Sequence, residues 1–301
     1  MDDPLHWIPV FFFLSSFVFF GLPHGAVDHW LYFRGRGIPL TPKSLSLFCA
    51  VYFGIFVLFV FLWVLFPAPS AIGFLILTAY HWGEGEYQYE KIQNGNPDTL
   101  LAVLRGLMPM ALPLVFHSET YRAVLAGAVR KYSYGDVPEF SFFAYPQTGI
   151  SVVAIVSILL LLHLFRTKTK GSKAEGKRAI AVNLLFFCGF LFLPPLVSVG
   201  LYFMFWHSIR HIRVACKAIA SPVYDETSGV SWLHFYWIAA PFTLLSILFL
   251  TILLYSQNPP TLSAQVILGD YLLLLWALTW PHCIVCHISL NTFLDVGKKG
   301  V

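Results

Sequence analysis

The sequence predicts an all-α protein with a single domain over residues 1–301, a bundle of about nine membrane-spanning helices, with eight as the alternative count. Of its 301 residues, 57% are hydrophobic and only 11% are charged, whereas soluble domains carry about 25% charged residues. The apolar residues gather in long runs, which is typical of membrane spans. The cationic residues fall in segments that nine spans would place on one side of a membrane. The net charge of +4 is too small to indicate nucleic acid as a partner.

Nine apolar runs approach the ~20 residues that a transmembrane helix needs. They are residues 5–22, 45–66, 69–82, 99–117, 148–165, 179–193, 195–212, 234–255 and 262–290. The runs at 69–82 and 179–193 are short, so either one could be a re-entrant segment. Residues 179–212 are broken only at Pro194 and Pro195. As one helix they would be roughly 50 Å long, against a ~30 Å hydrocarbon core, so two spans fit better.

The cationic residues predict the orientation of the chain. With nine spans, four cationic segments share one side, and the positive-inside rule makes that side cytoplasmic. The N-terminus then lies outside, and the C-terminus of this multi-pass cell-membrane protein lies in the cytoplasm. The four segments contain Arg34, Arg36 and Lys43; Arg166, Lys168, Lys170, Lys173, Lys177 and Arg178; Arg213 and Lys217; and Lys298 and Lys299.

Histidines close several of the predicted spans on this cytoplasmic side. His207 and His211 are four residues apart, so both imidazoles face one side of a helix and could bind one metal ion. His24 and His81 end two other spans beside glycines, which permit close approach of helices. Four imidazoles suit iron, copper or zinc. Spacing alone does not choose between an open iron site and a closed structural zinc site.

Ligating imidazoles normally donate their second N–H to a carboxylate or carbonyl oxygen. We expect Asp28, four residues after His24, and Glu84 and Glu86, three and five after His81, to be such partners, with a solvated interfacial carboxylate as the alternative for each. His29 is an alternative ligand to His24, although its offset turns it away from the same face. His282, next to Pro281, is expected in the substrate pocket or beside the ligands.

The last predicted span contains Cys283 and Cys286 followed by His287, which matches the C-x-x-C-H pattern of haem attachment. That chemistry needs a translocated, accessible segment, whereas this segment is apolar and lies in the cytoplasmic half of the span. We therefore expect the cysteines to be buried apolar residues. The role of His287 is left open.

Four motifs together resemble the Brp/Blh family: PHGAVDH at 23–29, YHWGE at 80–84, HSIRH at 207–211 and WPH at 280–282. The match runs from the first span to the last. The resemblance implies a membrane-embedded β-carotene 15,15′-dioxygenase that uses O2 to split the central double bond into two all-trans-retinal molecules, which supply a microbial rhodopsin. It also implies one non-haem iron(II) ion, Fe(2+), as cofactor. The implied iron ligands are His24, His81, His207 and His211.

A conjugated polyene partitions into membrane lipid, so a membrane-embedded enzyme can receive it laterally. A tunnel lined with aromatic side chains would suit it. The pocket candidates are the aromatic residues beside the presumed ligands: Tyr80, Trp82, Phe203, Phe205, Trp206 and Trp280.

Two other functions compete with this interpretation. A membrane di-iron desaturase or hydroxylase acting on lipid or carotenoid also uses histidines at a cytoplasmic membrane face. It needs several HxxxH and HxxHH boxes, and this sequence has one HxxxH and no HxxHH. A cation transporter would favour carboxylates inside the membrane or repeated halves. The sequence indicates neither of these features.

Overall fold

Helices form all the regular secondary structure in the part of the chain that the computed structural model describes, residues 7–94, 97–133, 140–170, 173–219, 231–255 and 264–296. The N-terminal third contains α1 (Trp7–Ser16), η1 (Phe17–Gly21), α2 (Leu22–Gly25), α3 (Asp28–Arg36), α4 (Pro42–Leu65) and α5 (Pro67–Asn94). The middle contains α6 (Thr99–Phe116), α7 (Ser118–Arg130), η2 (Ser141–Ala144), α8 (Pro146–Lys170) and α9 (Lys173–Phe192). The last third contains α10 (Pro195–Leu201), η3 (Tyr202–Ser208), α11 (Ile209–Ile219), α12 (Trp232–Tyr255) and α13 (Ala264–Val296).

The described residues of each predicted apolar run lie almost entirely in helices, which confirms the all-α prediction. The first residues of the runs 5–22 and 262–290 lie outside the described residues. Within the described ranges, five helical segments are long and apolar enough to cross a membrane: Trp7–Arg36, Pro42–Leu65, Thr99–Phe116, Trp232–Tyr255 and Val266–Leu290. Two shorter apolar helices span Gln147–His163 and Ile180–Phe192. The count of nine crossings stays a prediction.

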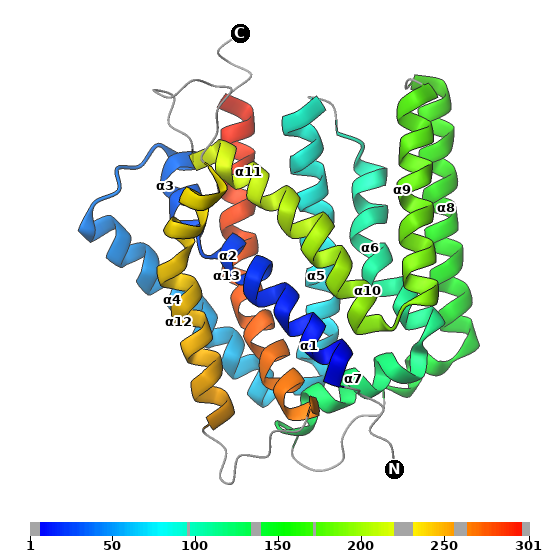
Figure 1. Ribbon diagram of the computed structural model, residues 1–301, viewed down its shortest axis with the longest axis horizontal. Coiled ribbons are helices and arrows are strands. Elements are labelled where there is room, and N and C mark those ends of the chain that lie inside the picture. The colour runs from blue at the N-terminus through cyan, green and yellow to red at the C-terminus, as the bar shows by residue number, and fades with distance from the viewer. Residues whose placement is uncertain are drawn as a thin grey trace.

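The helices run alternately between two ends of the molecule (Figure 1). The C-terminal ends of α5, α8, α11 and α13 lie at one end, and those of α4, α6, α9 and α12 lie at the other. This alternation is the one that nine spans require. Lys298 and Lys299 lie outside the described residues.

Local sequence explains where the helices begin and break. Thr41 caps α4 in a reciprocal capping box with Ser44, and Pro42 occupies the first turn. Asp98 caps α6 by accepting hydrogen bonds from the backbone N–H groups of Leu100 and Leu101. Helix α9 ends at Phe192, and α10 begins at Pro195 directly after Pro194, so the helix is broken at these prolines as predicted.

Helix α13 lies in the middle of the bundle and packs against α1, α3, α4, α5, α7 and α12. In contrast, α12 buries only Phe235 and Ala239 and presents Leu244, Leu248 and other apolar side chains outward. A helix that is apolar on all sides but lies on the outside of the bundle suits contact with lipid.

Helix α7 was not predicted. It is amphipathic and buries Tyr121 and Leu125 among other residues, and the chain after it brings Lys131 Nζ to 2.7 Å from Asp270 Oδ1. Asp270 is fully buried within α13. The expectation that the predicted spans hold no carboxylate was therefore wrong, because this carboxylate is neutralised by a partner from another helix.

Helices α5 and α6 cross closely at Gly83 and Gly106. A Cβ atom at Gly106 would lie 2.3 Å from the Ala79 carbonyl oxygen and 2.6 Å from the Gly83 backbone nitrogen. Small residues permit this kind of contact between membrane helices.

We expect Gly106→Ala to lower the free energy of unfolding by about 1–3 kcal/mol or more, because backbone atoms must move to admit the methyl group. The matched control is Gly189→Ala in α9, where nothing lies within 4 Å of the added Cβ. Thermal unfolding of the purified proteins in detergent measures the difference. Equal midpoints for the two variants would contradict the close crossing.

Candidate metal centre

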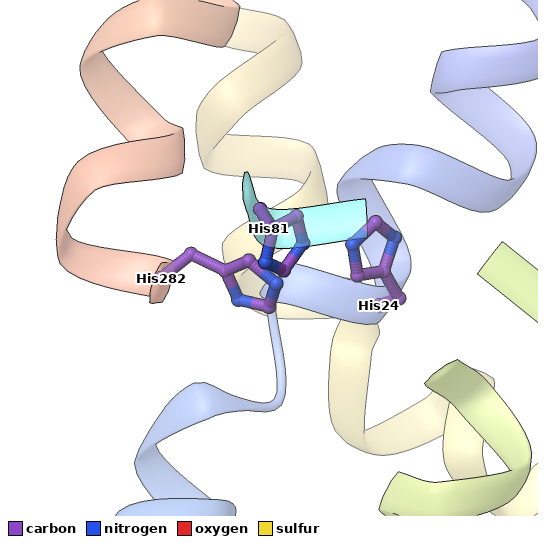
Figure 2. Close-up of side chains that lie close together, drawn as sticks. All are labelled: His24, His81 and His282. Atoms are coloured by element: carbon purple, nitrogen blue, oxygen red, sulfur yellow. The ribbon is translucent and has the colours of Figure 1, made fainter. Parts of the chain in front are cut away.

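Five buried histidines from five different elements converge inside the bundle: His24 of α2, His81 of α5, His207 of η3, His211 of α11 and His282 of α13. The ring centre of His24 lies 4.9 Å from that of His211 and 5.0 Å from that of His282. The ring centre of His81 lies 4.9 Å from that of His207 and 4.8 Å from that of His282. Figure 2 shows the His24, His81 and His282 rings facing one another. We call these five residues the histidine cluster.

Several ring nitrogens in the histidine cluster have no hydrogen-bond partner among the described residues. They are both ring nitrogens of His81, Nε2 of His207 and Nδ1 of His211. Buried polar atoms in proteins are normally paired. Ligand atoms of His24, His81 and His282 lie within 4.8 Å of one another. The cluster therefore offers the nitrogen donors that a transition-metal ion requires.

Among the described residues, one π-helical segment contains a residue of the cluster and another lies just before one. The sequence predicts an α-helix through His207 and His211, but His207 lies in the π-helix η3, and α11 begins only at Ile209. Both rings nevertheless reach the cluster, with ring centres 6.0 Å apart. The second π-helix, η1, precedes His24. Such segments occur frequently at functional sites.

Hydrogen bonds assign the tautomers of two of the imidazoles. His24 Nδ1 lies 3.2 Å from the carbonyl oxygen of Phe20, which can only accept, so Nδ1 carries the proton. His282 Nδ1 lies 2.8 and 2.9 Å from the two carboxylate oxygens of Asp28. The same carboxylate accepts a hydrogen bond of 2.9 Å from the Tyr52 hydroxyl. In both imidazoles Nε2 then carries the electron pair that could bind a ligand, and in His282 this atom lies 3.6 Å from Cys286 Sγ.

Asp28 thus contacts His282 rather than His24. The helix does not continue from His24, since α2 ends at Gly25 and Asp28 opens α3. His29 lies outside the histidine cluster, with its ring centre 4.9 Å from that of Phe242. Cys286 lies beside the cluster, with Sγ 3.3 Å from His211 Nε2.

We expect Asp28→Asn and His282→Ala each to weaken metal binding by about 10–100-fold, because His282 packs against the rings of His24 and His81 and Asp28 orients its imidazole. The double variant should lose little more than either single variant, since both changes remove the same arrangement. Competition with a coloured chelator measures the affinities. Additive losses would show that Asp28 does not act through His282.

A buried ion-pair network that the sequence did not predict lies beside the cluster. Glu86, expected as a partner of a ligating imidazole, pairs with two arginines instead. Glu86 bonds to Arg105 through one carboxylate oxygen, and its other oxygen lies 2.6 Å from Arg210 Nη1 and 3.1 Å from Trp206 Nε1. The Arg210 guanidinium lies 3.5 Å above the centre of the Trp206 ring. The network links α5, which carries His81, to η3 and α11, which carry His207 and His211. The sequence signal was two arginines inside apolar runs.

The remaining predicted residues lie in different places. Glu84 accepts from His287 Nδ1 at 2.7 Å, and the Tyr80 hydroxyl lies 3.2 Å from the same atom. Phe205 and Tyr80 are exposed on the outer surface, and Trp280 stacks on Phe59 with ring centres 4.2 Å apart. These side chains point away from the histidine cluster.

Two of the pocket candidates do lie against the cluster. The ring centres of Trp82 and Phe203 are 5.5 and 5.9 Å from that of His207. Outside the cluster, His163 pairs with Asp98 at 2.9 Å, and His234 is exposed.

A cavity of about 450 Å³ opens directly onto the histidine cluster. His24, His81 and His282 line it together with Trp82 and Phe203, and most of its other lining residues are aromatic or aliphatic. The cavity lies within the ~300–1,000 Å³ range of small-molecule sites. The site thus combines a nitrogen-rich centre with space for an apolar molecule.

The amino-acid sequence of this chain is similar to those of known proteins. A family model described as β-carotene 15,15′-dioxygenase matches residues 15–289. The chain is 30% identical over 297 residues to the probable β-carotene 15,15′-dioxygenase Blh of Halobacterium salinarum, covering 94% of this chain and 83% of that protein. It is 26% identical over 216 residues to the β-carotene 15,15′-dioxygenase of an uncultured marine bacterium, 66A03, covering 68% of this chain and 69% of the relative. No solved structure matches the chain significantly.

Proposed function

This chain belongs to the β-carotene 15,15′-dioxygenase family and is a carotenoid-cleaving enzyme, and on that premise we propose that it splits β-carotene at an iron(II) ion held by His24, His81, His207 and His211. The products are two molecules of all-trans-retinal. The observation that carries the proposal is the convergence of these four buried imidazoles, three of them with unpaired ring nitrogens. Two of the four, His24 and His81, line the apolar cavity.

The donor set fits iron. Imidazole is a suitable ligand for iron, and four neutral imidazoles would leave positions of a six-coordinate ion open to small molecules. When bound, iron(II) would supply the one-electron chemistry that lets dioxygen react with a polyene. His24 Nε2 is already free to bind, because Nδ1 donates to the Phe20 carbonyl.

The residues of the chain itself do the binding and positioning. His282, oriented by Asp28, packs against three of the four proposed ligands, His24, His81 and His211. Trp82 and Phe203 flank His207 and offer flat apolar surfaces to a conjugated chain. The apolar cavity excludes water from the double bond that breaks. Each carbon of that bond gains one oxygen atom to become an aldehyde.

The proposed activity requires access to a membrane-dissolved substrate. The chain would lie in the cell membrane with its N-terminus outside and its C-terminus in the cytoplasm, where the cationic segments place it. Its substrates are β-carotene and O2, and its retinal would supply a microbial rhodopsin. A di-iron desaturase would need more histidine ligands than the five that gather in the described residues.

Expression in a β-carotene-accumulating bacterium tests the activity. We expect loss of the orange colour and appearance of retinal in chromatograms of cell extracts. Metal analysis of the purified protein should give iron in a one-to-one ratio. Unchanged β-carotene in cells that contain the folded, iron-loaded protein would overturn the proposal.

A further inference from the structure

The cavity beside the histidine cluster is lined differently on its two flanks. Figure 1 places α4 and α12 on one flank of the bundle and α6 and α10 on the other, with α2 and α13 between them. On the flank of α4 and α12, the lining residues Phe53 and Leu245 are 62% and 58% exposed on the outer surface. On the opposite flank, the lining residues Met110 and Val199 are partly covered. The cavity therefore opens outward between α4 and α12.

This opening faces lipid. Outside the cavity, α4 presents Val51 and Leu58 to the surroundings, and α12 presents Leu244 and Leu248. A molecule dissolved among acyl chains would meet an apolar entrance here, with no polar surface to cross. The side chains of Cys49 and Ser246, which also line the cavity, are small enough to leave the entrance clear.

An aromatic pair, one ring from α4 and one from α12, closes one end of this opening. The ring centres of Phe56 of α4 and Phe249 of α12 lie 5.1 Å apart in an edge-to-face contact. Phe56 is buried and packs with Leu274 and Ala277 of the central helix α13. The pair closes the gap between α4 and α12 at one level, so access is confined to the stretch near Cys49, Phe53, Leu245 and Ser246.

We propose that β-carotene enters laterally from the bilayer between α4 and α12 and lies across the cavity, with one half on each side of the histidine cluster. The inference rests on the proposed function for the position of the reacting centre. The half beside α4 and α12 we call the mouth arm, lined by Phe53, Phe56, Leu245 and Phe249. The half beside α1, α6 and α10 we call the inner arm, lined by Phe13, Met110 and Val199.

A substrate that fills both arms would be cleaved near its centre, because the histidine cluster lies between the arms. The cluster histidines His24 and His282 line the same cavity and come from α2 and α13, the elements between its flanks. A symmetric polyene that fills both arms places its middle beside these residues. The depth of the inner arm then determines which double bond meets the reacting centre.

Matched tryptophan variants test the entrance. Leu245 and Leu244 are neighbours with similar exposure, 58% and 64%, but only Leu245 lines the cavity. In phosphatidylcholine nanodiscs with limiting β-carotene, we expect Leu245→Trp and Ser246→Trp to form retinal about tenfold more slowly. Leu244→Trp should match the unmodified protein, and all three should keep full iron content. Cys49→Trp narrows the entrance from the side of α4, so it replaces the α12 variants as the test if one of them fails to fold.

The outcomes separate the two proposals. If the unmodified protein forms no retinal, the proposed function fails. If it forms retinal and the folded Leu245→Trp, Ser246→Trp and Cys49→Trp variants all match its rate, the lateral entrance is wrong. Retention of β-carotene under anaerobic conditions, where no cleavage occurs, should fall in the same variants and not in Leu244→Trp.

A variant in the inner arm tests how the substrate lies. Met110→Trp shortens this arm at α6, so the polyene should stop short and present an off-centre double bond to the cluster. We expect less retinal and the appearance of unequal aldehyde products in chromatograms. Unchanged central cleavage at the normal rate would show that the substrate does not occupy the inner arm.

Discussion

We expect His207→Ala to purify with less than a hundredth of the iron affinity of the unmodified protein and to form no retinal. The variant removes an imidazole of the histidine cluster whose ring centre lies 4.9 Å from that of His81 and 5.4 Å from that of His24. Loss of even an outer partner of a metal ligand costs about 10–100-fold in affinity, and loss of a ligand costs more. Metal analysis and chelator competition give the affinity, and chromatography gives the product.

The matched control for this result is His234→Ala. His234 is exposed at the start of α12 and lies outside the histidine cluster, so this variant should keep both iron and activity. Size-exclusion chromatography of both proteins excludes misfolding as the cause of a loss. Stoichiometric iron in folded His207→Ala protein would show that His207 is not a ligand, and the ligand set would then have to include His282.

The second large effect concerns Glu86. We expect Glu86→Gln to lower the free energy of unfolding by about 3 kcal/mol, because it removes the buried carboxylate that contacts both guanidinium groups. The nearest remaining carboxylate, Glu90, lies 4.0 Å from Arg105 Nη1 and 3.8 Å from Arg210 Nη1. Arg105 is only 4% exposed, and Arg210 packs against Trp206. The same variant should weaken iron binding, since the network holds α5 against η3 and α11. Thermal unfolding in detergent, with and without added iron, measures both effects.

Glu84→Gln is the control for Glu86→Gln. Glu84 lies two residues earlier on α5, and its partner His287 has a side chain that is 60% exposed. Pairs that reach solvent or the interface contribute about 1 kcal/mol or less. We therefore expect a small change for Glu84→Gln. If both variants unfold at the same temperature, the buried network does not contribute the stability assigned to it.

The helices and part of the site were predictable because their signals are local. Apolar runs such as 45–66 and 234–255 predict helices wherever the surrounding medium is apolar. The pair His207 and His211 follows from helical spacing, and it survives the π-helical turn because both rings still face the interior. Proximity of His24 and His81 to this pair follows from topology, since three spans that end on one side bring their ends to the same depth.

Features that depend on how helices rotate against one another were not predictable. The sequence indicates that His282 lies near this depth, but its ring faces the cluster only because Asp28 and Tyr52 hold it there. The same holds for Glu86, whose two arginine partners lie 19 and 124 residues away in the chain. Of the six aromatic pocket candidates, Trp82 and Phe203 line the cavity, whereas Phe205 turns outward.

The sequence by itself determined that this chain is a helical bundle with histidines gathered at one depth, because hydropathy and spacing along one helix act over short distances. Only the tertiary structure decided that a fifth imidazole joins the cluster and that a cavity opens between α4 and α12. The physical reason is that each depends on side chains from separate helices. Their contacts are determined by the packing of the whole bundle around α13.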